Sequence, residues 1–243
     1  MSGSLKRDVE YHFRDLRMNG YFSVSTEGPS RRPGVLIVHD AFGLDSHCID
    51  VADRLATQGF AALALDLWGD RRQFTNSEEA MGMIAGLLND RDMWIGRVEA
   101  ARRSLAAQPG VDGTRVAAIG YCLGGSTVLE FARSGGDISG VVSFHGGLGF
   151  VGTDWDGTKV KARLLACTGA EDPLVPWDAL TTFQENVRRG GVNWEIDIYC
   201  RAKHSFTRPD AAVRSPDRSG YDAQADRRSW RAMLNFLDEV FAG

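Results

Sequence analysis

Short apolar runs alternate with longer amphipathic segments along most of the chain. The runs are rich in Val, Ile, Leu and Ala and lack polar alternation, which is typical of strands buried on both faces of a sheet. We predict strands at residues 35–39, 61–66, 116–121, 140–145, 164–168 and 194–199. The more polar, mixed segment 9–24 is expected to form an antiparallel hairpin at the edge of the sheet.

The segments between these strands have the periodicity of amphipathic helices. In residues 46–58 one apolar stripe holds Ile49, Ala52, Leu55 and Ala56, and Gly59 follows as a helix-ending glycine. Further helices are predicted at residues 77–89, 92–108, 124–133, 177–189 and 221–241. Strands and helices that alternate in this way predict an α/β fold, with a mostly parallel central sheet and helices on both faces.

The length and composition favour a single domain over residues 1–243. Hydrophobic residues make up 43% of the chain and charged residues 25%, the balance of an ordinary globular protein. There is no internal repeat, low-complexity tract or linker-like segment to mark a boundary. The polar stretch 201–220 is longer than most loops, and it is either functional or a surface excursion.

Charge and hydropathy exclude several classes of partner. The net charge of −4 gives no broad attraction to nucleic acid or to an anionic membrane surface. No apolar run approaches the roughly 18 residues that a membrane span requires. The first eight residues contain no apolar segment typical of a secretory signal, so we expect a cytoplasmic protein.

The four cysteines are too widely spaced for a structural framework. Cys48, Cys122, Cys167 and Cys200 include no C-x-x-C pair, which disfavours both a disulfide scaffold and a four-thiolate zinc site. Most of them are therefore expected to be small buried side chains, unless one occupies a position suited to chemistry.

Cys122 occupies such a position. The stretch 116–126 predicts a strand, a sharp turn with the pattern Gly-x-Cys-x-Gly, and a helix, which is the nucleophile-elbow pattern with cysteine in place of serine. The amides at the start of the following helix favour a thiolate, and the amide of Leu123 is suited to stabilise an oxyanion. A buried cysteine in a glycine-rich turn is the structural alternative.

The elbow predicts an acid and a histidine later in the chain, in that order. Asp172 follows the predicted strand 164–168, and His204 follows the strand 194–199. Asp172 is favoured over Glu171 because the Asp-Pro step fixes a turn at the end of the strand.

Three other histidines lie near predicted element ends. His39 and His145 end two core strands, and we expect them to form hydrogen bonds around the site or to line its wall. His47 is expected near the first turn of a helix. Only His204 has the chain order of the base.

The stretch 120–125 resembles the elbow of the dienelactone hydrolase family, the cysteine-dependent branch of the α/β-hydrolases. Segment 11–24 is similar to the family's N-terminal hairpin, 35–44 to its first central strand and turn, and 61–69 to its next strand. Asp172 and the segment 204–206 match its acid and base, so the likeness covers nearly the whole chain.

The resemblance implies a triad of Cys122, His204 and Asp172, with a thioester acyl-enzyme and no metal or organic cofactor. It implies an oxyanion hole that combines the amides of Leu123 and Ala41. The family often carries a glutamate that holds the resting cysteine proton, and Asp40 stands at that position. The aspartate is shorter by one methylene, about 1.5 Å, so either it modulates the thiol or it is a turn residue without that contact.

The substrate class depends on an arginine. Family members that act on dienelactones grip the substrate carboxylate with arginines, and Arg208 matches one of them. A second has no clear match, the nearest candidates being Arg71, Arg72, Arg91 and Arg97. The resemblance therefore implies hydrolysis of a small ester or lactone, either a carboxylate-bearing dienelactone or a neutral ester or thioester. A redox-sensing or ligand-binding thiol on the same fold, or a peptidase, are the alternatives.

Overall fold

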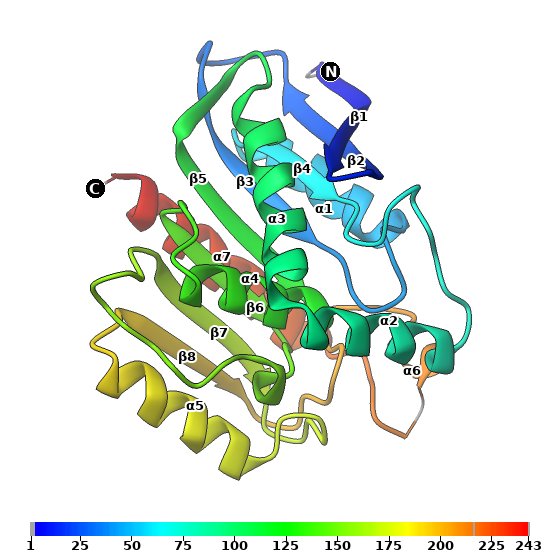
Figure 1. The fold of residues 1–243 in the computed structure, drawn as a ribbon, viewed down its shortest axis with the longest axis vertical. Helices are drawn as coiled ribbons and strands as arrows, with labels where there is room; N and C mark the ends of the chain where they lie inside the picture. Colours follow the sequence, from blue (N-terminus) through cyan, green and yellow to red (C-terminus); the bar gives the residue numbers. More distant parts are fainter. Residues whose placement is uncertain (1–2, 216, 243) are drawn as a thin grey trace. The chain divides into compact units, whose positions relative to one another are not determined.

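The alternation of strands and helices is present in the computed structural model, which describes residues 3–215 and 217–242 (Figure 1). The chain divides into two units, Met1–Ala118 and Ile119–Gly243, which are described in turn. The single domain expected from the sequence stays a prediction. None of the helices in the described part of the chain is long and apolar enough to span a membrane.

The first unit begins with the expected hairpin. Strands β1 (Ser4–Phe13) and β2 (Leu16–Ser25) pair antiparallel and extend beyond the predicted range at both ends. Strand β2 also pairs antiparallel with β4 (Ala61–Leu65), which in turn pairs parallel with β3 (Arg32–Val38). The order β1-β2-β4-β3 leaves the hairpin at an edge, as predicted.

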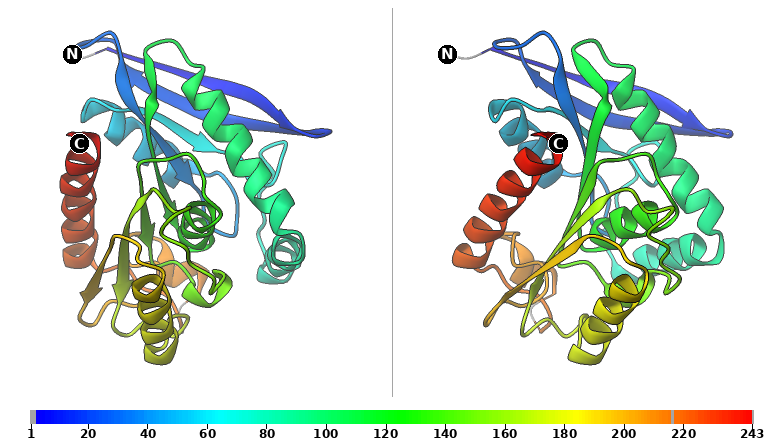
Figure 2. Two further views of the ribbon diagram at one scale, coloured as in Figure 1. Left: turned by 60° about the vertical axis from the view of Figure 1, so that its left-hand side comes forward. Right: turned by 90° about the vertical axis from the view of Figure 1, so that its left-hand side faces the viewer.

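Helices lie on both sides of these strands. Helix α1 (Ser46–Thr57) lies on one side and α3 (Arg91–Ala106) on the other, with α2 (Ser77–Asn89) preceding α3 (Figure 2). Asp45 begins α1 by accepting a hydrogen bond from the amide of His47. The buried face of α1 includes Cys48 and Val51, whereas Ile49 is only partly buried. The face that packs against the sheet is therefore rotated slightly from the predicted apolar stripe.

Strand β5 (Val111–Tyr121) leads from the first unit into the second and starts five residues before the predicted strand. In the second unit β6 (Gly140–Phe144), β7 (Arg163–Gly169) and β8 (Trp194–Tyr199) pair parallel in chain order. Every residue of β6 is buried, as its continuous apolar run predicts.

Three long helices flank these strands. Helices α4 (Leu123–Arg133) and α5 (Trp177–Arg189) lie on one face, and α7 (Ala223–Ala242) lies on the other (Figure 2). The stretch 201–220 has structure of its own: it contains α6 (Ala211–Arg214) and a parallel bridge between His204 and Ser219. A short 3₁₀ helix, η1 (Leu148–Phe150), follows β6.

Candidate active site

The predicted elbow forms at the junction of β5 and α4. Cys122 lies between the last residue of the strand and the first residue of the helix, with φ 54° and ψ −115°. A non-glycine residue adopts such a backbone only when its surroundings enforce it, and this conformation is typical of functional turns. The turn therefore projects one side chain out of an otherwise buried strand and helix.

Glycines around Cys122 make the tight turn sterically possible. A Cβ at Gly120 would overlap the carbonyl group of Gly124, which is backbone and cannot move aside. A Cβ at Gly125 would lie 2.6 Å from the Oγ of Ser143. The Gly-rich pattern read from the sequence thus has a direct structural cause.

Three side chains of the second unit form a hydrogen-bonded row. The Nε2 atom of His204 lies 3.1 Å from the Sγ atom of Cys122, and its Nδ1 atom lies 2.9 Å from Oδ2 of Asp172. The other carboxylate oxygen of Asp172 accepts a 2.8 Å hydrogen bond from the amide of Leu174. Asp172 and His204 are buried, whereas Cys122 is partly accessible. This geometry allows a proton to move between the thiol and the imidazole.

The electrostatics favour a protonated His204. Burial lowers the pKa of the imidazole, but the negative charge of a Cys122 thiolate and the hydrogen bond to Asp172 outweigh it and raise the pKa to about 10. At neutral pH the ring is then an imidazolium, and it holds beside the sulfur of Cys122 the proton that a leaving group needs.

His145 connects the nucleophile turn with the segment that carries His204. The amide of Cys122 is shared between two acceptors, the carbonyl of Phe144 at 3.0 Å and the Nδ1 atom of His145 at 3.1 Å. Because Nδ1 accepts, the neutral ring carries its proton on Nε2. That proton is donated to Oγ1 of Thr207 at 2.8 Å. The His145 ring is fully buried, and its centroid lies 5.3 Å from that of His204. This hydrogen-bonding role was one of the two expected for His145, whereas no sequence pattern indicated Thr207.

The turn after β3 carries Asp40 and Ala41 in the first unit. Asp40 is buried, and its Oδ1 atom accepts a 2.8 Å hydrogen bond from the amide of Phe42. The carbonyl oxygen of Ala41 accepts a 3.2 Å hydrogen bond from the indole Nε1 of Trp68. These contacts order the turn. The contact of Asp40 with the thiol and the pairing of the Ala41 and Leu123 amides stay predictions.

Arg208 is buried rather than solvent-facing. Its Nε and Nη2 atoms donate to the two carboxylate oxygens of Asp210, at 3.1 and 3.2 Å. Asp210 is about half exposed, while the Arg208 side chain is 6% exposed. A substrate carboxylate would therefore have to share this guanidinium with, or take it from, a carboxylate already in place.

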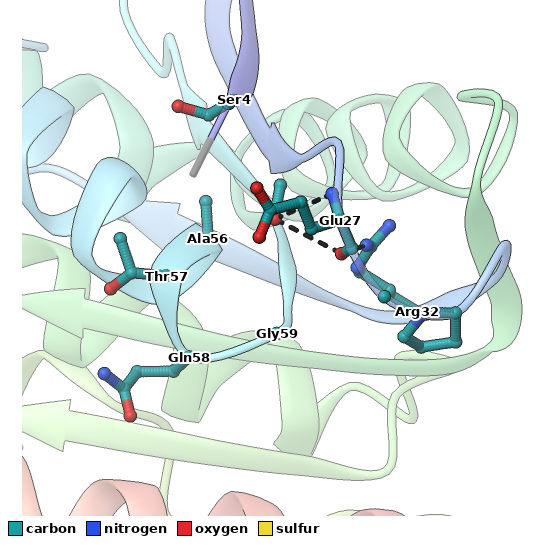
Figure 3. A pocket seen from close by; sticks show the side chains of 11 residues that line it. Ser4, Glu27, Arg32, Ala56, Thr57, Gln58 and Gly59 are labelled. Atoms are coloured by element: carbon teal, nitrogen blue, oxygen red, sulfur yellow. Dashed lines mark hydrogen bonds between the residues drawn. The ribbon is translucent and has the colours of Figure 1, made fainter. Parts of the chain in front are cut away.

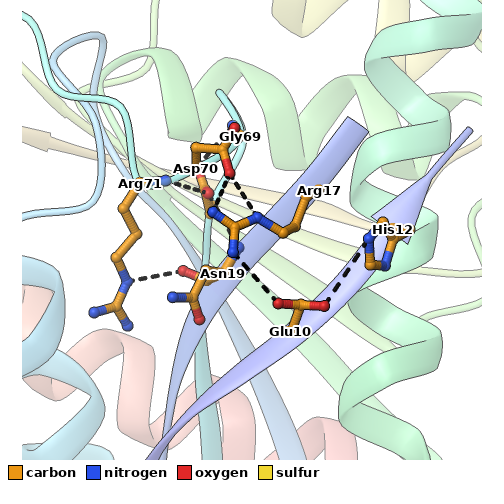
Figure 4. Close-up of polar contacts among 8 residues, drawn as sticks. Glu10, His12, Arg17, Asn19, Gly69, Asp70 and Arg71 are labelled. Atoms are coloured by element: carbon orange, nitrogen blue, oxygen red, sulfur yellow. Dashed lines mark hydrogen bonds and ion pairs between the residues drawn. The ribbon is translucent and has the colours of Figure 1, made fainter. Parts of the chain in front are cut away.

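The candidates for a second arginine at the site are Arg71, Arg72, Arg91 and Arg97. The Nε atom of Arg71 donates to the carbonyl of Asn19 in the hairpin (Figure 4). Its Nη2 atom donates to the carbonyl of Gly20. Arg97 is partly buried, which lowers its pKa, and it donates to the carbonyl of Leu67 at 2.8 Å. The other two lie over aromatic rings. Each of the four therefore has at least one structural contact.

A surface hollow of about 480 Å³ lies elsewhere in the first unit (Figure 3). It is lined by the ends of the hairpin, including Ser4 and Glu27, by Arg32, and by the end of α1, from Ala56 to Gly59. None of the predicted site residues lines it. We assign no role in the chemistry to this hollow.

Comparison with known proteins decides the family. A family model described as "Dienelactone hydrolase family" matches residues 18–241. The chain belongs to the dienelactone hydrolase family. Membership of this family indicates an enzyme that hydrolyses esters or lactones, on the α/β-hydrolase fold.

Individual relatives agree with this assignment. A dienelactone hydrolase-like promiscuous phosphotriesterase from metagenomic libraries is 39% identical, with a TM-score of 0.92 over 98% of both chains. A Yersinia pestis protein provisionally named a carboxymethylenebutenolidase is 25% identical over 217 residues, 85% of this chain and 78% of its own. The dienelactone hydrolase of Anabaena variabilis shares the fold, with 20% identity and a TM-score of 0.64 over 95% of this chain and 98% of its own.

Proposed function

We propose that this protein hydrolyses a small ester or lactone by transferring the acyl group to Cys122. The observation that carries the proposal is the row Cys122–His204–Asp172, with contacts of 3.1 and 2.9 Å. It joins a partly accessible sulfur to a buried imidazole and a buried carboxylate, in the chain order typical of this fold.

The chemistry proceeds in two halves. In the first, the Cys122 thiolate attacks the carbonyl carbon, and the imidazolium of His204 gives its Nε2 proton to the leaving oxygen. The C–O bond breaks, a thioester remains, and His204 is neutral. In the second, His204 takes a proton from a water molecule that attacks the thioester. The thiolate leaves with the C–S electron pair, and the carboxylic acid is released.

Two turns supply the groups around this reaction. The amide of Leu123, at the first position of α4, has no acceptor within its own helix and is available to a developing oxyanion. From the family resemblance we propose the amide of Ala41 as the second donor and Asp40 as the acid that modulates the resting thiol. Asp172 orients the imidazole through Nδ1. This chemistry uses only side chains and amides of the chain.

The substrate class follows from Arg208. If it grips a substrate carboxylate, the substrate is a carboxylate-bearing lactone such as a dienelactone. The ion pair with Asp210 favours a second candidate, a neutral ester or thioester, because the charge of Arg208 is already balanced. Both candidates use the same acyl transfer at Cys122.

The test uses two small esters that differ only in a carboxylate. Wild type, Cys122→Ala, Cys48→Ala and Arg208→Ala are compared by steady-state hydrolysis. Cys122→Ala should abolish turnover, and Cys48→Ala, a change in the buried face of α1, should leave it largely intact. Equal losses from the two changes would overturn the proposal, and no turnover by wild type would favour a binding or redox-sensing thiol.

The same experiment separates the substrate classes. A preference of about tenfold for the anionic ester, equivalent to about 1.4 kcal/mol, that disappears in Arg208→Ala would identify a dienelactone-type substrate. A neutral ester hydrolysed equally well or better would identify a general esterase.

A further inference from the structure

The turn that carries Ala41 is preceded by a histidine that the proposed chemistry does not use. His39 is the first residue after β3, and it is fully buried in the first unit. Its Nε2 atom lies 3.1 Å from the amide nitrogen of Leu67, and its Nδ1 atom lies 2.6 Å from the carbonyl oxygen of Asp40. Both ring nitrogens are thus in contact with backbone groups of two different turns.

These contacts fix the protonation state of the ring. The amide of Leu67 can only donate, so Nε2 accepts, and the proton of a neutral ring must be on Nδ1. Nδ1 then donates to the carbonyl of Asp40. Complete burial lowers the pKa of His39 and opposes a second proton on Nε2, where it would face the Leu67 amide. The ring is a neutral donor to one turn and an acceptor from the other.

The hydrogen bond to Asp40 determines the direction of the next amide. A peptide unit is planar and trans, so the carbonyl of Asp40 and the N–H of Ala41 point in opposite directions. The same carbonyl also accepts a longer hydrogen bond of 3.4 Å from the amide of Gly43, so the ring and the turn together hold the Ala41 N–H pointing the other way. Rotation of the peptide unit would break the hydrogen bond and leave a buried imidazole N–H without its acceptor.

The following peptide unit is held as well. The carbonyl of Ala41 accepts the hydrogen bond from Trp68, which is itself buried beside His39, with ring centroids 5.8 Å apart. The carbonyls on both sides of the Ala41 residue therefore have aromatic donors. The amide between them is fixed before any substrate arrives, which is what electrostatic stabilisation of an oxyanion requires.

We infer that His39 is a positioning residue for the oxyanion hole, and that it holds the Asp40–Ala41 peptide with the Ala41 N–H presented to the developing oxyanion. The inference rests on the proposed function, since it assumes that the Ala41 amide serves acyl transfer. It adds a residue that touches neither the substrate nor the nucleophile and acts only through the orientation of one peptide.

Two substitutions of His39 each retain one of the two hydrogen bonds that the ring makes. In His39→Asn the side-chain amide can donate from the position of Nδ1 and so retains the bond to Asp40. In His39→Gln the amide reaches the position of Nε2 and retains only the acceptor for Leu67. We expect kcat of His39→Gln to fall about 100-fold, the effect of losing one oxyanion donor, with little change in KM. His39→Asn should retain most of kcat.

Alkylation of Cys122 by iodoacetamide supplies the control, because displacement of iodide develops no oxyanion. The alkylation rate should be unchanged in both variants while kcat differs. An unchanged kcat in His39→Gln, a kcat no higher in His39→Asn than in His39→Gln, or alkylation that falls in parallel with kcat would each overturn the inference.

If the histidine variants do not fold, Trp68→Phe tests the same turn from its other side. This change keeps an aromatic ring but removes the donor to the Ala41 carbonyl. We expect a lower kcat with unchanged alkylation, and an unchanged kcat would count against the inference. Failure of the proposed function is recognised separately, by a Cys122→Ala variant that still turns over ester.

Discussion

The turn after β5 and the turn after β3 are each contacted by a fully buried histidine, but the two rings bind opposite ends of the peptide group. His145 accepts from the amide of Cys122, and together with the carbonyl of Phe144 it fixes the residue whose side chain reacts. His39 donates to the carbonyl of Asp40, and so it fixes the direction of the next amide. The tautomer differs accordingly, with the proton on Nε2 in His145 and on Nδ1 in His39.

The backbone strain at the two turns also differs. Cys122 has a positive φ, and its turn excludes a Cβ at Gly120, whereas neither Asp40 nor Ala41 is among the residues with positive φ. The turn after β5 must hold the side chain of Cys122 on a strained backbone. The turn after β3 needs only to orient the N–H of Ala41. Changes at the first turn should therefore affect both folding and chemistry, and changes at the second mainly the chemistry.

The largest effect is expected from Gly120→Ala. The new Cβ would overlap the backbone of Gly124, so the free energy of unfolding should fall by about 3 kcal/mol, with loss of turnover. Denaturant unfolding measures the change. Gly82→Ala is the control, because the added Cβ meets nothing within 4 Å in α2 and should stabilise slightly. If Gly120→Ala is as stable as wild type, the turn after β5 is no more strained than the turn after β3, and the contrast between them fails.

A smaller loss of stability is expected when the hydrogen bond between Nε2 of His145 and Oγ1 of Thr207 is removed. Thr207→Val keeps the shape of the side chain but leaves the Nε2–H of His145 buried without its acceptor, at a cost of about 2 kcal/mol. Thr207→Ser keeps the hydroxyl and should cost about 1 kcal/mol for the lost methyl group. Thermal or denaturant unfolding distinguishes them. If the valine variant is as stable as the serine variant, the hydrogen bond does not hold the turn.

The third prediction concerns the charge of Cys122. The imidazole of His204 should stay protonated as pH rises, losing its proton only near pH 10. In Cys122→Ser the thiolate charge is absent, so the pKa of His204 should fall by a unit or more, equivalent to about 1.4 kcal/mol. NMR titration of the imidazole nitrogens measures the pKa of His204 in wild type and in the variant. The exposed Cys200 supplies the control, since Cys200→Ser should leave the titration unchanged. An unchanged pKa in Cys122→Ser would mean that the thiolate does not act on the ring.

Much of this could be predicted from the sequence, because the signals were local. Continuous apolar runs give strands buried on both faces, and a strand followed by Gly-x-Cys-x-Gly and a helix gives the elbow. The order of acid and histidine along the chain then indicates Asp172 and His204 as the candidate acid and base. Boundaries were less accurate: β5 begins five residues before its apolar part, where polar residues continue the strand.

Other features could not be predicted, because they depend on contacts between distant segments. Nothing in the sequence links Trp68 to the carbonyl of Ala41, or Thr207 to His145, and each contact forms only when separate strands end side by side. The pairing of Arg208 with Asp210 is close in sequence, but its burial is set by the fold.

The central claim is that the acyl group is carried by the sulfur of Cys122, and trapping that intermediate tests it most directly. The protein would be mixed with a slowly hydrolysed ester, quenched in acid and examined by mass spectrometry. We predict a mass increase equal to the acyl group, on the peptide that contains Cys122, and no adduct in Cys122→Ala. Turnover accompanied by an adduct on another residue, or undiminished in Cys122→Ala, would contradict the account.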